Sequence, residues 1–141
     1  MDFDFGLLCD YAYIGDGSKF FILGEFRYIR AFELPATHPR MSLALRITAF
    51  KNEGLEHKLR LMLVDADGHD VLSQLSQVEG PIQFGDIGPA SVGRIHAQVT
   101  MELGGIKFES EGDYRFDIFI DGQRIGGVPF HVMKIPKPST P

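Results

Sequence analysis

The chain has no tryptophan, a single cysteine and no block of like charge, and each of these features argues against a class of protein. One cysteine, Cys9, excludes an intramolecular disulfide, so we expect the core alone to hold the fold. No charged start followed by a continuous apolar run marks a signal peptide or a membrane span. The sequence therefore predicts a cytoplasmic protein with no membrane partner.

Charge is spread along the whole chain. Nineteen acidic and 14 basic residues give a formal net charge of -5. Because neither sign is gathered into a stretch that can follow a phosphate backbone, we expect no nucleic-acid partner. The absence of tryptophan also weakens a carbohydrate-binding interpretation, since sugar-binding sandwiches commonly stack sugars on Trp or Tyr faces.

Phenylalanine and glycine are abundant, with 12 and 16 residues, which suits strands separated by tight turns. The clearest pattern lies in the last third of the chain. Apolar residues alternate over 114–120, an Asp121-Gly122 turn follows, and the alternation resumes over 128–132, which predicts a β-hairpin. The same period of two predicts further strands over residues 3–13, 20–28, 43–49, 59–63 and 95–103.

The segments between these strands carry predictions of their own. Residues 34–40 hold two prolines and are expected to form a loop that crosses between sheets. A polar strand over 69–77 is expected to pair back across the turn at 65–68. The Gly- and Pro-rich residues 80–93 are expected to be irregular, as an interaction loop or as the cover of a sheet face. Residues 41–50 fit a strand, and also a helix with one apolar stripe.

These elements predict an all-β fold, a two-sheet antiparallel β-sandwich of immunoglobulin-like type with about eight strands. Residues 1–133 are expected to form the domain, and residues 134–141, with three prolines, a disordered tail. Tyr114 stands at the start of a late strand. It fits a tyrosine corner, whose hydroxyl returns to nearby backbone, and the alternative is a tyrosine that packs within a strand.

No motif carries recognisable chemistry. The turn at 65–68 has two aspartates before its glycine, which is too few for a calcium loop, and a hairpin turn needs no ion. Cys9 is expected to be a small buried apolar residue. We therefore expect no catalytic residue, no metal and no cofactor. An enzyme would need a set such as His96, Glu102 and Asp113 brought together from separate strands.

Short motifs at turns and strand ends carry a resemblance to a known family. They are Cys9-Asp10-Tyr11-Ala12, Gly17-Ser18-Lys19 leading to Ile22-Leu23-Gly24, Leu59 to Gly68, Gly112-Asp113-Tyr114 and Val128-Pro129-Phe130. In these the chain resembles, over nearly its whole length, a family of short bacterial proteins of unknown function. The resemblance implies one cytosolic all-β unit, and it brings no activity, cofactor or catalytic residue.

Several predicted strands are apolar on both faces. Leu8 and Ala12 share the outward face of the first strand, Phe21 and Leu23 that of the second, and Phe119 that of the last hairpin. In a two-layer sandwich one face of each sheet meets water, so a partner subunit, a partner protein or a folded-back loop has to cover this surface.

The sequence thus predicts a noncatalytic protein that acts through protein contacts, as a homo-oligomer or an accessory subunit. Leu8, Phe21, Leu23 and Phe119 are the expected interaction residues. The alternative is a small-molecule or carbohydrate-binding module that uses residues 80–93 and Phe84.

Overall fold

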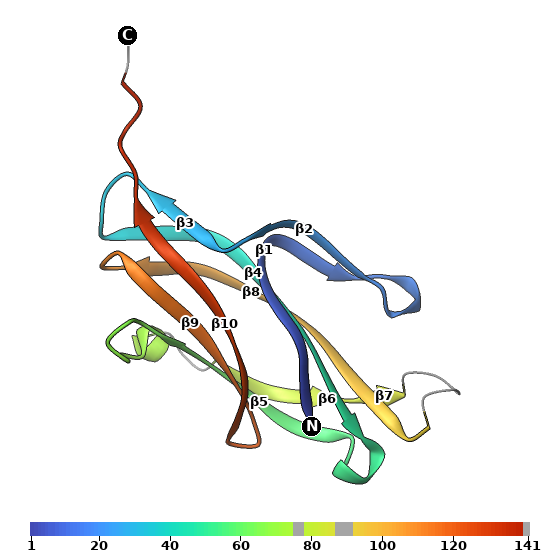
Figure 1. Ribbon diagram of the computed structural model, residues 1–141. Helices are drawn as coiled ribbons and strands as arrows, with labels where there is room; N and C mark the ends of the chain where they lie inside the picture. The colour runs from blue at the N-terminus through green and yellow to red at the C-terminus, as the bar shows by residue number, and fades with distance from the viewer. Residues whose placement is uncertain (75–77, 87–91, 140–141) are drawn as a thin grey trace.

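In the computed structural model, which describes residues 1–74, 78–86 and 92–139, the chain folds into two packed five-stranded sheets (Figure 1). The strands are β1 (Asp2–Ile14), β2 (Phe20–Phe26), β3 (Tyr28–Ala31), β4 (Ala36–Phe50), β5 (Glu56–Val64), β6 (Glu79–Gln83), β7 (Gly85–Asp86), β8 (Arg94–Phe108), β9 (Gly112–Ile120) and β10 (Gln123–Lys134). Sheet A has the order β2-β1-β4-β8-β7 and sheet B the order β3-β10-β9-β5-β6. The predicted β-sandwich is confirmed.

The strand count differs from the prediction because the chain changes sheets more often than expected. The expected strand over 20–28 is two strands, since β2 belongs to sheet A and β3, after Arg27, to sheet B. β3 also pairs with β10 in parallel, which departs from the expected all-antiparallel arrangement. The segment over 41–50 is a strand, within β4, and not a helix.

The crossing predicted over 34–40 is shorter than expected. β4 already begins at Ala36 and includes Pro39. Before Ser42, β4 pairs only with β8 among the described residues, so Pro39 lies where one side of the strand has no described partner and a missing N–H is tolerated. The prediction that prolines bar pairing here was wrong for this reason.

Two other predictions about connecting segments were wrong. Residues 71–74 form a 3₁₀ turn instead of a polar strand, with Leu72 buried against the core, and residues 75–77 lie outside the described residues. Residues 79–86 are not irregular, because β6 and β7 form the edges of the two sheets. Phe84, between them, is buried. The expected loop over 87–91 lies outside the described residues.

The core lies between the sheets and is built by alternate residues of the long strands. β4 contributes Leu43, Leu45 and Ile47, which are fully buried, and the facing strands contribute Phe116 and Ile118 among others. Tyr114 is buried in an aromatic cluster at one end of this core. Its hydroxyl donates to the Ser110 carbonyl at 2.7 Å, so Tyr114 forms the tyrosine corner.

β1 carries a bulge that changes which residues face the core. Phe3 pairs with Ile47 and Phe5 with Arg46, so Asp4 is an extra residue on β1. A one-residue shift turns every later side chain to the opposite face. Leu8 is therefore 1% exposed and lies in the core, and its predicted outward position was wrong.

The last hairpin turns as predicted, through Asp121 and Gly122, which both have positive φ, 50° and 84°. This geometry is that of the type I′ turn, for which Asp-Gly is a preferred pair. The chain then continues from β10 into the predicted tail. Within the described tail residues, the Ile135 amide donates to the Ala31 carbonyl and Lys137 forms an ion pair with Glu33. The disorder predicted for residues 134–141 stays a prediction.

Tyr114→Phe tests the corner. The variant keeps the ring packing and loses the hydrogen bond to Ser110, so we expect the free energy of unfolding to fall by about 1–2 kcal/mol. Tyr28→Phe is the control, because Tyr28 is 53% exposed. Urea unfolding measures both variants, and equal stabilities for the two would contradict the role given to the hydroxyl.

Candidate functional site

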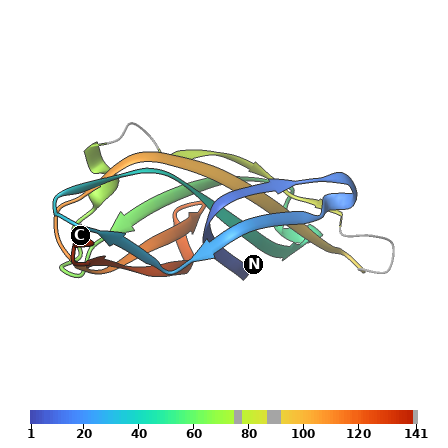
Figure 2. The ribbon, with the colours of Figure 1, turned by 90° about the horizontal axis from the view of Figure 1, so that it is seen from above.

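The first hairpin, β1 with β2, lies across the outer face of sheet A. β1 pairs with β4 only as far as Cys9 opposite Ser42, and beyond that point its one strand partner among the described residues is β2. Near the hairpin tip, the Ser18 carbonyl accepts a hydrogen bond from the Gln98 side chain of β8 at 2.8 Å. The hairpin tip and the C-terminal tail lie at opposite ends of the molecule (Figures 1 and 2).

A second, small hydrophobic cluster fills the space beneath the hairpin. Cys9, Ala12 and Ala44 are buried there, with Phe20 and Ile22 packed against them. Burial raises the pKa of the Cys9 thiol, whose sulfur lies 3.7 Å from the Ser42 carbonyl. The hairpin is thus itself a cover for part of the apolar outer face of sheet A, so the predicted outward position of Ala12 was wrong.

Arg46, on strand β4 of sheet A, holds two aromatic rings of this packing in place. The Phe5 and Phe20 rings meet edge to face, with centroids 5.5 Å apart. The Arg46 guanidinium lies over both rings, 4.9 Å from the Phe5 centroid and 5.7 Å from that of Phe20. It also binds the Gln98 side chain that holds the hairpin tip. Cation–π contacts of this kind stabilise the docked hairpin.

The other face of the hairpin is exposed and apolar. Tyr11, Tyr13, Phe21 and Leu23 are 41%, 42%, 42% and 59% exposed, and we call these four residues the aromatic face. Tyr13 and Phe21 are cross-strand partners whose rings stack 4.7 Å apart, and Tyr11 is the partner of Leu23. The Arg40 guanidinium lies 5.6 Å from the Tyr11 ring centroid.

The structure separates the four residues expected to make contacts. Phe21 and Leu23 are both on the aromatic face, whereas Leu8 is in the core. Phe119 lies on the outer side of sheet B but is half-buried, with the Arg60 guanidinium 4.5 Å from its ring centroid. The second hairpin therefore offers a polar outer surface instead of an apolar one.

A buried carboxylate reinforces this polar character of sheet B. Asp117 is 6% exposed and receives hydrogen bonds from Arg115 and Arg124 at 2.6 and 2.9 Å. Burial raises its pKa, but the two guanidinium groups together outweigh that effect and hold the pKa below its usual value.

Sequence reasoning missed Tyr11 and Tyr13, because the alternation that sets Leu8 and Ala12 on the outward face of the first strand sets these odd-numbered residues on the opposite face. The geometry of the turn determines their position. Because the Gly15 amide donates to the Lys19 carbonyl, the two strands pair in a register that places Tyr13 opposite Phe21.

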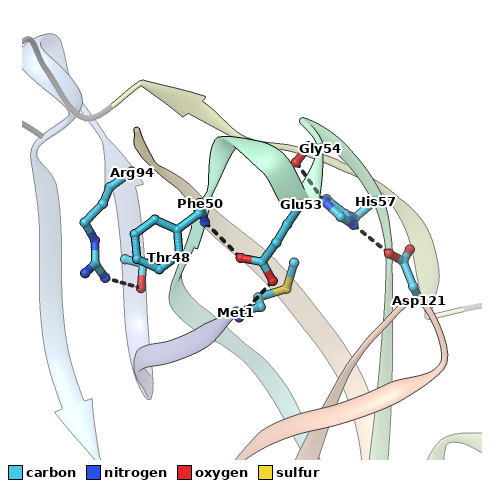
Figure 3. Close-up of polar contacts among 8 residues, drawn as sticks. All are labelled: Met1, Thr48, Phe50, Glu53, Gly54, His57, Arg94 and Asp121. Carbon is cyan, nitrogen blue, oxygen red and sulfur yellow. Dashed lines mark hydrogen bonds and ion pairs between the residues drawn. The ribbon is translucent and has the colours of Figure 1, made fainter. Parts of the chain in front are cut away.

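A polar cluster joins the N-terminus, the turn at 51–54 and the β9–β10 turn (Figure 3). His57 is held by acceptors on both ring nitrogens, the Asp121 carboxylate at 2.5 Å and the Gly54 carbonyl at 2.9 Å. The hydrogen bond to Asp121 is the main cause that raises the pKa of His57, and its counterpart lowers the pKa of Asp121. Beside them, Glu53 accepts from the Met1 ammonium and from the Phe50 amide. Both His57 nitrogens are engaged, so the imidazole acts as a clamp between loops.

The three residues proposed for an enzyme, His96, Glu102 and Asp113, are not brought together in the structure. His96 and Glu102 lie on the same strand, β8, six residues apart and so about 20 Å along it. Asp113 lies in the other sheet, where it pairs with His131 at 2.9 Å. These three groups are too far apart for shared proton transfer.

The turn at 65–68 brings three potential ligands together, since oxygen or nitrogen atoms of Asp65, Asp67 and His69 lie within 4.8 Å of one another. Asp65 already accepts hydrogen bonds from the backbone amides of Asp67 and His69, each at 2.9 Å. The bond from the His69 amide is the main cause that lowers the pKa of Asp65. The Asp65 carboxylate therefore builds the turn, although no returning strand follows it at 71–74.

A cleft of about 460 Å³ opens between β6 and β8, where the two sheets diverge. Aliphatic side chains of both sheets line it, namely Leu59, Val78, Val99, Met101, Leu103 and Ile106. Gly80 and Pro81, from the segment proposed for ligand binding, also line the cleft, but Phe84 does not and is buried elsewhere.

Among the described residues, no helical segment has the length and apolar character that a membrane crossing requires.

The His57 clamp predicts a pH dependence of stability. Because the pKa of His57 is raised on folding, its contribution is complete below about pH 6.5, the unfolded value, and is lost as the pH rises through the folded pKa. We expect the melting temperature of the wild type to fall by a few degrees as the pH rises through the folded pKa of His57, and the melting temperature of His57→Gln to change less. Calorimetry from pH 5 to 9 measures both, and parallel curves would contradict the clamp.

Comparison with known proteins identifies a family and little else. A family model described as a family of unknown function, DUF6941, matches residues 4–133. No curated protein matches the chain. One solved structure, the Pseudomonas fluorescens alkylpurine DNA glycosylase AlkC bound to DNA containing an abasic site analog, shares 13% identity at a TM-score of 0.36. The match covers 76% of this chain and only 27% of the glycosylase chain, and similarity this low supports no argument about function.

The family match agrees with the predicted resemblance to a family of unknown function, while the bacterial origin stays a prediction. Because the match extends over most of the 141 residues, the chain belongs to the family of unknown function DUF6941.

Proposed function

We propose that the protein acts through protein contacts, as a self-assembling subunit whose contact surface is the aromatic face. The observation that carries the proposal is the exposure of all four residues of that face, between 41% and 59%, on one side of a hairpin. Exposed apolar patches rimmed by polar residues mark interaction sites, and aromatic residues are enriched in the centres of interfaces.

The hairpin is suited to this role because it is held rigidly. Its inner face packs on Phe5 and Ala44, and its tip is bonded to Gln98. The aromatic side chains are therefore presented in a fixed arrangement, with the Tyr13 and Phe21 rings stacked, and little side-chain freedom is left to lose on binding. A cytoplasmic location, expected from the single cysteine, is part of the same proposal.

Phe21→Glu tests the proposal. A carboxylate at the centre of the aromatic face has to be desolvated in any contact there, so we expect the variant to sediment as a monomer at concentrations where the wild type associates. Phe32→Glu is the matched control, because Phe32 is similarly exposed, 46%, but lies outside the hairpin. Sedimentation velocity over a concentration series, with circular dichroism to verify folding, gives the result. A wild type that is monomeric throughout would remove the proposal.

The cleft between β6 and β8 favours a second function, the binding of an apolar small molecule. Its lining includes Val99, Met101 and Leu103, which are only partly buried although they contact the core. The lining of the cleft, as far as it is described, contains no aromatic ring, so it suits an alkyl chain better than a sugar. Glu79 and Glu102 also line it, which favours an uncharged alkyl compound over an anionic one.

Thermal shift with 1-octanol tests this second function. We expect the melting temperature of the wild type to rise with 1-octanol concentration relative to that of Met101→Trp, whose larger side chain fills the cleft. Glucose serves as the control ligand. Equal responses of the wild type and Met101→Trp to 1-octanol would exclude the cleft as a site for such chains.

A further inference from the structure

β8 is paired along its whole length on one side only. On that side β4 accompanies it from end to end. On the other side β7 pairs with Ile95 and His96, and beyond these two residues no strand of the described chain pairs with β8. We call this unpaired side of β8, over residues 98–104, the open edge. The cleft between β6 and β8 lies along it.

The open edge borders a position in sheet A that β7 fills over two residues only. Phe84 alone carries the chain from β6, the last strand of sheet B, to β7, the last strand of sheet A, so the outermost positions of the two sheets face each other. β6 has five residues, and β7 begins only where β6 ends. The position beside β8 that faces β6 therefore holds no strand in the described structure, and the cleft of about 460 Å³ lies there.

The hydrogen bonds at the start of β8 show which of its backbone groups face the open edge. The Lys51 amide donates to the Gly93 carbonyl, which continues the register of β4 with β8. The Phe50 amide, one residue earlier, donates to the Glu53 side chain and so points away from β8. Because such pairs alternate in an antiparallel ladder, the odd-numbered residues of β8 as far as Leu103 bond to β4, and the even-numbered ones point away from it.

Three residues of the open edge therefore offer both of their backbone groups to a new strand, namely Gln98, Thr100 and Glu102. Between them, Val99 and Met101 line the cleft and are only partly buried although they contact the core. A strand added here forms backbone hydrogen bonds with β8 and buries its inward side chains in the cleft. Extended peptides bind to the edges of sheets in this way.

The space suits one extended strand and excludes a second folded copy. Sheet B continues as β6 across from the open edge, so a second copy that paired its own β8 there would bring its sheet B against β6. A single peptide brings no second sheet, and it lies about 4.8 Å from β8, as neighbouring strands do. An alkyl compound fills the apolar interior as well, but it leaves the backbone groups of Thr100 without a protein partner.

Charge at the cleft indicates a basic residue in the peptide. The charged residues that line the described part of the cleft are Glu79 and Glu102, both acidic. They form ion pairs with Lys58 and Arg40, yet the Glu102 side chain remains 61% exposed and open to a further cation. A residue directly opposite Glu102 on an added strand lies on the same face within about 5.5 Å. A lysine or arginine there complements the carboxylate, whereas an acidic residue is repelled by it.

We propose that the cleft is a peptide-binding site, where a segment of a partner protein with alternating aliphatic residues adds to sheet A as an antiparallel strand beside β8. The strand continues the line and the direction of β7, its aliphatic side chains enter the cleft, and its lysine or arginine stands opposite Glu102. The inference goes beyond the proposed self-assembly, because it uses the cleft and not the aromatic face. It also gives the cleft a different occupant from the alkyl compound of the second function.

A seven-residue peptide tests the inference. In Thr-Val-Lys-Val-Thr-Val-Thr, acetylated and amidated at its ends, the three valines stand opposite Leu103, Met101 and Val99, and the lysine opposite Glu102. We expect the amide resonances of Thr100 and Glu102 to shift as peptide is added, and the hydrogen exchange of these two amides to slow at least tenfold at saturation, because both become hydrogen-bonded. 1-Octanol is the control ligand, since it offers no backbone to β8 and is expected to leave this exchange unchanged.

N-methylation gives a matched control within the peptide. In the proposed register the lysine amide donates to the Glu102 carbonyl, and the amide of the middle valine points away from β8. We expect methylation of the lysine nitrogen to raise the dissociation constant roughly tenfold, and methylation of the middle valine nitrogen to leave it nearly unchanged. Equal effects of the two methyl groups would overturn the addition of a strand.

Charge exchange measures the contact with Glu102 separately. Replacing the peptide lysine by glutamate is expected to weaken binding to the wild type about fivefold, since it sets two carboxylates opposite each other. The same replacement is expected to matter less for Glu102→Gln, which keeps the shape of the side chain and removes its charge. An equal ratio for the two proteins would overturn the register.

Two protein variants separate the inference from the proposed self-assembly. Met101→Trp fills the cleft and is expected to lose peptide binding, whereas Phe21→Glu alters only the aromatic face and is expected to keep it. Circular dichroism verifies that both variants fold. A wild type that does not bind the peptide, or that binds it no better than Met101→Trp does, would overturn the inference. Association of the wild type that Phe21→Glu abolishes would still support the contact role of the aromatic face.

Discussion

The docking of the first hairpin onto sheet A is the constraint on which the rest of the account depends. β1 leaves β4 after Cys9, and the chain beyond it has to cover an outer sheet surface that contains Phe5 and Ala44. Phe20 and Ile22 provide that cover, and Arg46 and Gln98 hold it in place. Once one face of the hairpin is used in this way, the opposite face, made of Tyr11, Tyr13, Phe21 and Leu23, has to meet solvent or a partner.

The side chains that each hairpin places on its outer face also explain why the second hairpin is a poorer contact surface. β9 and β10 are covered on one side by the main core, and on the other side Phe119 lies under Arg60 beside the Asp117 carboxylate. Charged groups held by their own partners are costly to bring into an interface, whereas exposed aromatic rings gain from it. The contrast between the two hairpins thus follows from which side chains each strand places outside.

The alternation of apolar residues was enough to predict the two-sheet fold and the last hairpin, because period two and an Asp-Gly turn are local signals. It left Tyr114 open between a corner and packing within a strand, since the hydrogen bond to Ser110 is not visible in the pattern. Leu8 was misplaced because the extra residue Asp4 shifts the alternation within one strand, and no local pattern marks such a bulge. The edge strands β6 and β7 were missed because they contain Pro81 and Gly85. These residues are tolerated in an edge strand, but in the sequence they are typical of an irregular loop. Phe21 and Leu23 were placed on the outward face because both faces of β2 are apolar, but the pairing of Tyr13 with Phe21 depends on the register of the turn.

Proton NMR of the aromatic face tests the central claim most directly. The Tyr13 and Phe21 rings are exposed and stacked on each other, so their resonances report any contact made on that face. If copies of the protein associate through this face, the Tyr13 and Phe21 resonances shift as the protein concentration rises, while the resonances of the buried Phe116 ring stay constant. Tyr13 and Phe21 resonances that stay constant at every concentration would contradict the account.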